Sequence, residues 1–270
     1  CFASHHRKQE QQSLLSFKSS LTTTDPNHSL SSWTVDIPFC NWTGVICDLQ
    51  QHAVVSLNLS AMGLQGSVSS HLANLSFLQT IELKYLSLRG NRLGGAIPSS
   101  LGSLLELTHL DLGQNIISRQ IPSQLGYLTN LVHLDLSVNH LNGTIPSLRR
   151  LEILERLFLQ NNQFVGTIPD ELGQLKHLHV LKISHNKLSG RIPQSIGNLQ
   201  RLKRLFLHHN HLSDMIPFGL GYCKELQLLD LSHNSLIGSS TTRSCESLSY
   251  KILSESVIQL FRGFRASRDW

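Results

Sequence analysis

The sequence predicts an α/β solenoid, an elongated array in which short parallel strands stack along one axis. Residues 131–146 read LVHLDLSVNHLNGTIP, and their spacing of leucines returns along most of the chain. The copies begin at Leu83, Leu107, Leu154, Leu178, Leu202 and Leu226. Successive copies start 24 residues apart, with one step of 23. A fixed period of this length is typical of repeat proteins, in which each unit contacts only its neighbours.

Each copy has the pattern L-x-x-L-x-L-x-x-N-x-L, which is that of a leucine-rich repeat. The leucines of L-x-x-L-x-L alternate, which predicts a short strand with its leucines turned inward and a parallel sheet on the concave side. The amide of the ninth-position asparagine both donates and accepts hydrogen bonds, so we expect it to satisfy backbone groups in the turn after the strand. These asparagines are Asn91, Asn115, Asn139, Asn162, Asn186, Asn210 and Asn234.

Some repeats depart from the pattern. The first repeat, residues 54–68, has Met62 where asparagine is expected. Additional residues near 81–85 predict a bulge or a longer convex loop before the second repeat. Arg119 and Asp214 occupy the thirteenth position, where glycine commonly holds a positive φ. The geometry of those two turns therefore stays open.

The N-terminal region differs from the repeats. Residues 10–22 predict a helix that turns Leu14, Phe17 and Leu21 to one side and stops at residues 25–26. Cys40 and Cys47 follow in a loop-rich segment, where a disulfide would contribute roughly 2–3 kcal/mol. Zinc would need two further ligands at metal spacing, and these are missing. The pairing of Cys1, Cys223 and Cys245 stays open, with a buried free thiol expected at Cys223.

Two features carry a resemblance to a known family. LLSFKSSL, then Trp33, then C-N-W-T-G-V-I-C resemble the N-terminal cap of plant leucine-rich repeat receptor kinases and receptor-like proteins. The repeat ending L-x-G-x-I-P also resembles the plant-specific type. The resemblance covers residues 10–238 and implies a right-handed superhelix, a second short sheet near G-x-I-P, and a cap in which Trp33 and Trp42 pack over the first repeat.

The resulting division has three parts. Residues 1–50 form the helical cap, residues 51–238 form about eight repeats, and residues 239–270 fall outside the repeat pattern. Relatives continue with further repeats, a membrane helix and a kinase, so we expect the third part to be a truncated or atypical end. The chain also starts at Cys1 without an apolar leader, which fits a removed signal peptide or a fragment.

Composition narrows the classes of function. The net charge is +5 and the pI about 9.1, but the basic residues form no stripe and no nucleic-acid motif is present. The sequence contains no run of 18 or more apolar residues, so it predicts no membrane-spanning helix. Five N-x-S/T sequons favour an extracellular location, because such sites receive N-glycans in secreted chains. They begin at Asn27, Asn41, Asn58, Asn74 and Asn142.

The sequence gives no sign of an enzyme or a cofactor. It has no G-x-S-x-G elbow, phosphate loop or kinase motif set, so we assign no catalytic residue. Fifteen histidines raise the question of a metal, above all His208, His209 and His211. In the repeat frame His211 turns away from the other two, so we expect solvated histidines and no metal site. Asp111, Asp135 and Asp230 lack the cleft of a glycosidase pair.

Two functions fit these features, and a purely structural scaffold stays open as a third interpretation. The first is the ectodomain of a plant receptor-like kinase or receptor-like protein, which recognises an extracellular peptide or protein at the cell surface, with a co-receptor of similar repeats as a further partner. The second is a secreted inhibitor of a cell-wall hydrolase, similar to polygalacturonase inhibitors. That inhibitor class has a C-terminal cap with its own cysteine pair, which Cys245 alone does not supply. The receptor is therefore favoured.

The outward strand positions locate a candidate binding patch. In repeats three and four they are polar and are expected to be solvated: His109, Asp111, Gln114, His133, Asp135 and Val138. In repeats five to seven they become aromatic and cationic: Arg156, Phe158, Gln160, Val180, Lys182, His185, Arg204, Phe206, His208 and His209. Aromatic residues and arginine dominate interface hot spots, so we predict that this patch binds an acidic or carboxylate-ending peptide. A glycan on Asn58 would obstruct the other end. Packing of the two phenylalanines on neighbouring side chains is the competing interpretation.

Overall fold

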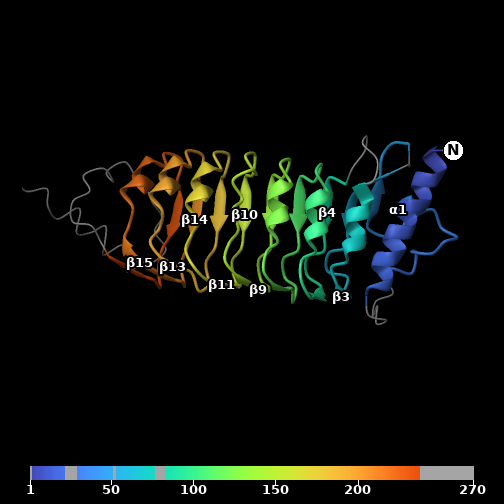
Figure 1. The fold of residues 1–270 in the computed structure, drawn as a ribbon, viewed down its shortest axis with the longest axis horizontal. Helices are drawn as coiled ribbons and strands as arrows, with labels where there is room; N and C mark the ends of the chain where they lie inside the picture. Colours follow the sequence, from blue (N-terminus) through green and yellow to red (C-terminus); the bar gives the residue numbers. More distant parts are fainter. Residues whose placement is uncertain (1, 22–28, 51–52, 77–82, 238–270) are drawn as a thin grey trace, which may run out of the picture.

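The computed structural model describes residues 2–21, 29–50, 53–76 and 83–237 of the chain. These residues form a curved, elongated array with α1 (Phe2–Ser19) at its N-terminal end. The strands and the connecting segments run across the long axis and stack one behind the next (Figure 1). The predicted solenoid with an N-terminal helical cap is therefore confirmed.

The concave side is a sheet of nine strands, one from the cap and one from each repeat. Its order is β1 (Val45–Cys47), β2 (Val54–Asn58), β4 (Tyr85–Ser87), β6 (His109–Asp111), β8 (His133–Asp135), β10 (Arg156–Phe158), β12 (Val180–Lys182), β14 (Arg204–Phe206) and β16 (Leu228–Asp230). β1 is antiparallel to β2 and every other neighbour pair is parallel. Equivalent positions of successive repeats are register partners in this sheet, although the offset is 29 residues from Ser56 to Tyr85 and 23 from His133 to Arg156.

A second set of short strands follows each turn. Their pairs are parallel and link β3 (Gln65–Ser67) with β5 (Arg92–Gly94); β7 (Ser118–Arg119) with β9 (His140–Gly143) and β11 (Gln163–Phe164); and β13 (Ser189–Gly190) with β15 (His211–Met215) and β17 (Ser235–Ile237). The resemblance implied one second short sheet, and the described residues instead form three separate short sheets in that place. Short 3-10 helices complete the convex side: η2 (Ser70–Ser76), η3 (Ser99–Ser103), η4 (Ser123–Tyr127), η5 (Asp170–Gln174), η6 (Gln194–Asn198) and η7 (Phe218–Tyr222).

The fourth repeat lacks this helix. All residues between β9 and β10 are described, and none of them is in a 3-10 helix. This repeat has 23 residues, one fewer than the other regular repeats. The shorter length and the absence of the 3-10 helix therefore occur in the same repeat. Glycines at the helices pack closely on the next repeat: a Cβ added to Gly173 would collide with the backbone carbonyl of Ser195.

The asparagines at the ninth position bond backbone groups of their own turn, as predicted, and also form a hydrogen-bond ladder to the preceding repeat. All seven accept a backbone N–H of the preceding repeat through Oδ1, as Asn139 does from Ile117 at 2.9 Å. Each Nδ2 donates to carbonyls of its own turn and of the preceding repeat, at Leu136 and Leu112 in the case of Asn139. The ladder therefore also ties successive repeats together.

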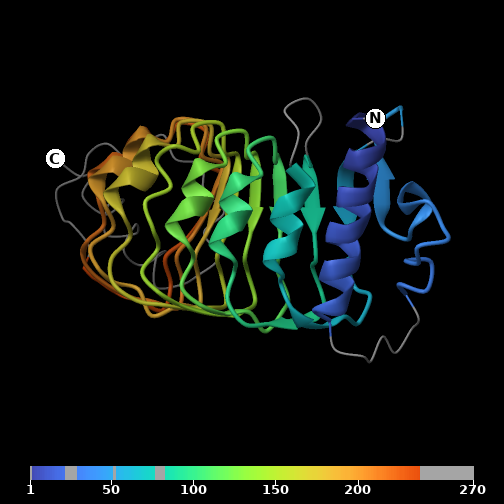
Figure 2. The same cartoon turned by 45° about the vertical axis from the view of Figure 1, so that its right-hand side comes forward.

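The cap packs its aromatic residues as the sequence indicated. Trp33 and Trp42 stack with centroids 5.2 Å apart, and both are almost fully buried. Leu14 and Phe17 of α1 are fully buried, and α1 lies beside η2 of the first repeat (Figure 2). The Cys40–Cys47 disulfide is present, so the zinc alternative is wrong. Its short loop leads from η1 (Phe39–Asn41) to β1.

Several local expectations need correction. The cap helix spans Phe2–Ser19 and not residues 10–22, so it begins earlier and ends earlier than predicted. Tyr85 belongs to strand β4 and not to the additional loop. Arg119 and Asp214 both have φ of +72°, so the expected left-handed turn forms without glycine. Cys223 is a fully buried free thiol, as expected, and burial raises its pKa to about 11.

Some expectations fall outside the described residues. These are Cys1, Asn27, most of the additional loop before the second repeat, and residues 239–270 with Cys245. Within the described part of the chain, no helix has the length and apolarity needed to cross a membrane.

Candidate ligand-binding face

The concave sheet places the predicted patch in two adjacent rows. Arg156, Val180 and Arg204 are register partners across β10, β12 and β14. Phe158, Lys182 and Phe206 are register partners two residues further along the same strands. Neighbouring strands lie about 4.8 Å apart, so each arginine is about 10 Å from the other and next to the aromatic row.

Lys182 is held between the two phenylalanines. Its Nζ lies 5.2 Å from the ring centroid of Phe158 and 5.2 Å from that of Phe206. The rings keep part of their surface exposed, as does Lys182, and Arg156 and Arg204 are exposed. Cation–π contacts of this kind contribute about 0.5–1 kcal/mol at exposed sites. The competing interpretation is therefore partly right, since both rings pack on a neighbour. All three members of this aromatic–cation row, Phe158, Lys182 and Phe206, nevertheless keep part of their surface exposed.

Val180 does not belong to the contact surface. It is only 2% exposed, although its strand position is outward, so its assignment to the patch is wrong. Gln160 is half-buried, with an Oε1 that is buried and has no hydrogen-bond partner.

The eighth position of each repeat lies in the turn and not in the strand. His185, His209 and His233 occupy it in repeats six to eight, with φ values of +53°, +54° and +52°. Their rings form a column, with centroids 4.2 Å apart for His185 and His209 and 4.0 Å apart for His209 and His233. The sequence did contain this signal, because the three histidines are spaced by 24 residues.

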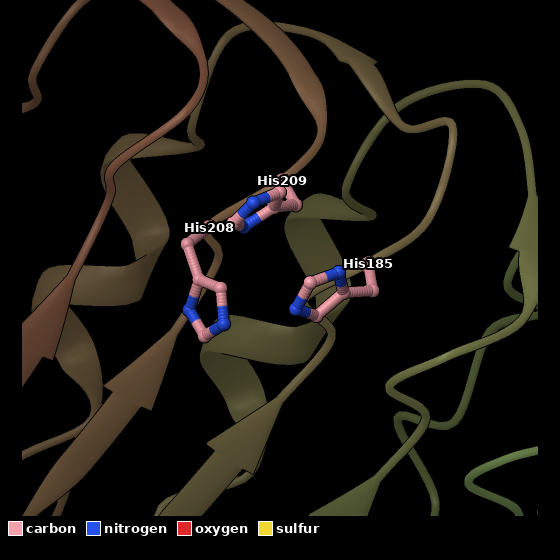
Figure 3. A group of neighbouring side chains, drawn as sticks. All are labelled: His185, His208 and His209. Atoms are coloured by element: carbon pink, nitrogen blue, oxygen red, sulfur yellow. The ribbon is translucent and has the colours of Figure 1, made fainter.

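His208 joins this column from the strand side. Its ring centroid is 5.1 Å from that of His185 and 5.4 Å from that of His209. Its Nδ1 is buried and lies 3.1 Å from Asp230 Oδ2, although the two atoms are not aligned as a hydrogen bond. Burial lowers the pKa of His208, and the Asp230 carboxylate opposes that effect. Figure 3 shows the rings of His185, His208 and His209 around one common space.

His211 takes no part in this group. It lies in β15, in the second row of strands, so the expected separation of His211 from His208 and His209 is confirmed. What the repeat frame missed is His185, because a neighbour in the preceding repeat is 23 residues away in sequence but adjacent in the stack.

In the expected solvated surface of repeats three and four, Gln114 and Val138 are exposed as expected, but Asp111 and Asp135 form an ion-pair network with Arg89. Arg89 Nη1 lies 2.6 Å from Asp135 Oδ2 and 3.5 Å from Asp111 Oδ1. Asp135 is only 5% exposed and also accepts from Ser137. Burial lowers the pKa of the adjacent His133, with Asp135 opposing the shift. This region therefore already satisfies its charges internally, unlike the exposed arginines of repeats five and seven.

The sequons differ in accessibility. Asn41, Asn58 and Asn142 are exposed, and Asn74 is half-buried. Asn58 ends strand β2 of the concave sheet, at the opposite end from the aromatic–cation row. A glycan there remains a prediction.

The known families that match this chain follow the same division into cap and repeats. The leucine rich repeat N-terminal domain matches residues 7–48, and the leucine rich repeat family matches residues 81–141, 152–212 and 177–236. Together the repeat matches cover more than half of the chain. The chain belongs to the leucine-rich repeat family. Its matched regions resemble the repeat ectodomains of receptors, which are non-catalytic.

Curated relatives of this leucine-rich repeat chain are receptors of Arabidopsis thaliana. The LRR receptor-like serine/threonine-protein kinase EFR is 40% identical over 95 residues, which make up 35% of this chain and 9% of EFR. Receptor-like protein 31 is 38% identical over 108 residues, covering 37% of this chain and 12% of that protein. The chain thus matches only a small part of each relative's length.

Solved structures match over a larger share of the chain. The complex PEPR1–AtPEP1 has a TM-score of 0.80 and 33% identity, covering 90% of this chain and 34% of that one. Arabidopsis HAESA, solved with the peptide hormone IDA and the co-receptor SERK1, has a TM-score of 0.78 and 35% identity, covering 90% and 41%. A plant ice-binding protein has a TM-score of 0.57 and 25% identity, covering 86% and 88%. Since this fold occurs with different functions, the site has to carry the functional argument.

Proposed function

We propose that this chain is an extracellular ligand-recognition module of a plant receptor-like kinase or receptor-like protein. Its concave face at repeats five to seven would bind an acidic or carboxylate-ending peptide. The observation that carries the proposal is the partly exposed aromatic–cation row, Phe158, Lys182 and Phe206, with an exposed arginine beside each phenylalanine.

The chemistry of this row suits an extended anionic peptide. Arg156 and Arg204 lack a carboxylate partner among the ion pairs of the described residues, so their guanidinium groups remain available. A guanidinium binds a carboxylate through two parallel hydrogen bonds, and the half-exposed phenylalanine rings offer apolar contact between the two charges. The similar PEPR1 and HAESA structures contain peptides, which supports a peptide as the ligand class. A co-receptor such as the one in the HAESA complex is part of the same proposal.

The probe for the first test is an array of synthetic peptides. It contains acidic peptides with a free C-terminal carboxylate, the same peptides amidated at the C-terminus, and basic peptides of equal length. We expect the free-acid peptides to bind best. The double variant Arg156→Glu/Arg204→Glu should lower the affinity for these peptides at least tenfold. Phe206→Ala should weaken both acid and amide forms.

A matched control separates the site from net charge. Arg149→Glu/Arg191→Glu makes the same change of charge on two exposed residues outside the concave sheet. Equal losses for the two double variants, or equal binding of acidic and basic peptides, would refute the placement of the site. Inhibition of a polygalacturonase by the unmodified chain, without selective peptide binding, would instead support the inhibitor alternative.

A further inference from the structure

The three-histidine cluster, His185, His208 and His209, lies at the edge of the proposed peptide site but has a chemistry of its own. Each residue offers a ring nitrogen, and these three atoms all lie within 4.8 Å of one another. The cluster joins two repeats, since His185 comes from the turn of repeat six and the others come from repeat seven. We propose that it binds one divalent transition-metal ion of the Zn²⁺ or Cu²⁺ class.

The ligand geometry is close to that of a coordination site. Three nitrogens at about 2.0–2.1 Å from one zinc ion lie about 3.3 Å apart in a tetrahedral arrangement. Shifts of about 1 Å therefore bring the cluster to coordination distance. His185 and His209 are exposed and sit in turns, so their rings can tilt out of their stacked arrangement. Imidazole nitrogens favour zinc, copper and nickel over calcium or magnesium.

A carboxylate behind His208 supports the same assignment. Histidines that bind metals commonly direct their second nitrogen to a carboxylate, which fixes the ring and raises its basicity. Asp230 Oδ2 lies 3.1 Å from the buried Nδ1 of His208, which leaves Nε2 for the ion. Asp230 is itself fixed, because its Oδ1 accepts from the backbone N–H and the hydroxyl of Ser232 at 3.0 and 2.6 Å.

The cluster of Asp111, His133 and Asp135 is a weaker candidate. Its donor atoms also lie within 4.8 Å of one another. However, Arg89 pairs with both carboxylates, and Asp135 Oδ1 also accepts from Ser137. A metal ion there would have to displace the guanidinium of Arg89. At the three histidines, no ion pair of the described residues places a cation that a metal ion would have to displace. Among the described residues, the three-histidine cluster is thus the preferred metal site on this face. It would link repeats six and seven and leave a coordination position open to water or a ligand carboxylate.

The test uses the full chain and the metals alone, without any peptide. Isothermal titration with ZnCl₂, and copper EPR after addition of CuSO₄, should show a tight 1:1 site with nitrogen ligands. His185→Ala and His208→Ala should each weaken binding at least tenfold. Asp230→Asn keeps the acceptor for Ser232 and should weaken binding about 10–100-fold. His211→Ala is the matched control, because it removes an exposed histidine of the same repeat outside the cluster.

The circular dichroism spectrum and the melting temperature establish that each variant is folded. Retention of the tight site in both His185→Ala and His208→Ala would overturn the proposal, as would an equal loss in His211→Ala. So would the absence of any binding by the unmodified chain at millimolar metal. These results are independent of peptide binding, so the metal site and the proposed receptor function can fail separately.

Discussion

The asparagine ladder gives the sharpest stability prediction, at Asn139. Its side chain is 6% exposed and makes one bond as acceptor and three as donor. We expect Asn139→Leu, which changes side-chain volume little, to remove all four bonds. The three carbonyls keep another donor each: Asn115 at Leu112, Asn162 at Leu136, and a backbone N–H at Ser137.

The backbone N–H of Ile117 is the group that loses its hydrogen-bond partner in this variant. Its bond to Asn139 Oδ1 is 2.9 Å long, and the described residues offer it no second acceptor. Leaving a buried donor without a partner costs about 1–3 kcal/mol. For a chain of this size that corresponds to a fall in melting temperature of roughly 2–10 °C. Hydrogen exchange provides the direct assay, because the Ile117 amide should lose protection in the variant.

Two further substitutions make the test specific. Asn234→Leu removes equivalent hydrogen bonds at the last repeat, where the side chain is only half-buried and water can replace them. We therefore expect it to lower the free energy of unfolding by less than half as much as Asn139→Leu does. Asn142→Leu changes an exposed asparagine of β9 and should have little effect when tested on unglycosylated protein. Equal destabilisation by all three substitutions would refute the reasoning, because it would mean that the ladder bonds have no special weight. Ser137, a surface position by its place in the repeat, is 1% exposed and is unsuitable as a control.

Three other predictions follow from backbone geometry and burial. Arg119→Gly should raise stability by about 0.5–1 kcal/mol in chemical denaturation, because glycine holds the observed φ of +72° without the penalty of a side chain; unchanged stability would argue against strain there. Glu10 is buried, and its Oε2 accepts a hydrogen bond from the backbone N–H of Val54 at 2.6 Å. Burial raises the pKa of Glu10 to about 8. The stability that the protonated carboxyl contributes is therefore fully present below pH 4.5 and is lost as the pH rises through about 8. The slope is at most about 1.4 kcal/mol per pH unit, and Glu10→Gln should flatten it between pH 5 and 8; parallel pH profiles would contradict the assignment. Gly173→Ala should destabilise far more than Gly126→Ala in thermal melting, because an added Cβ collides with backbone at Gly173 but comes only within 3.2 Å of Ser147 O at Gly126; similar losses would show that the backbone relaxes at both sites.

The sequence by itself determined the repeat register, the cap, the strand positions and the asparagines that satisfy the turns. These features can be predicted because every repeat has the same local requirements. Leucines at a fixed spacing have to be buried, and one asparagine has to hydrogen-bond the backbone groups of the turn. Even Arg119 and Asp214 follow the common turn, since the neighbouring repeats impose a left-handed backbone that these residues would rarely adopt alone.

Contacts between repeats were decided only by the tertiary structure. Val180 has an outward position in the strand, yet it is buried in the folded chain. Arg89 reaches Asp135 two repeats further along the stack, and His185 meets His208 from the next repeat. Such pairs depend on side-chain length and rotamer across strands about 4.8 Å apart, and the pattern within one repeat contains no information about either.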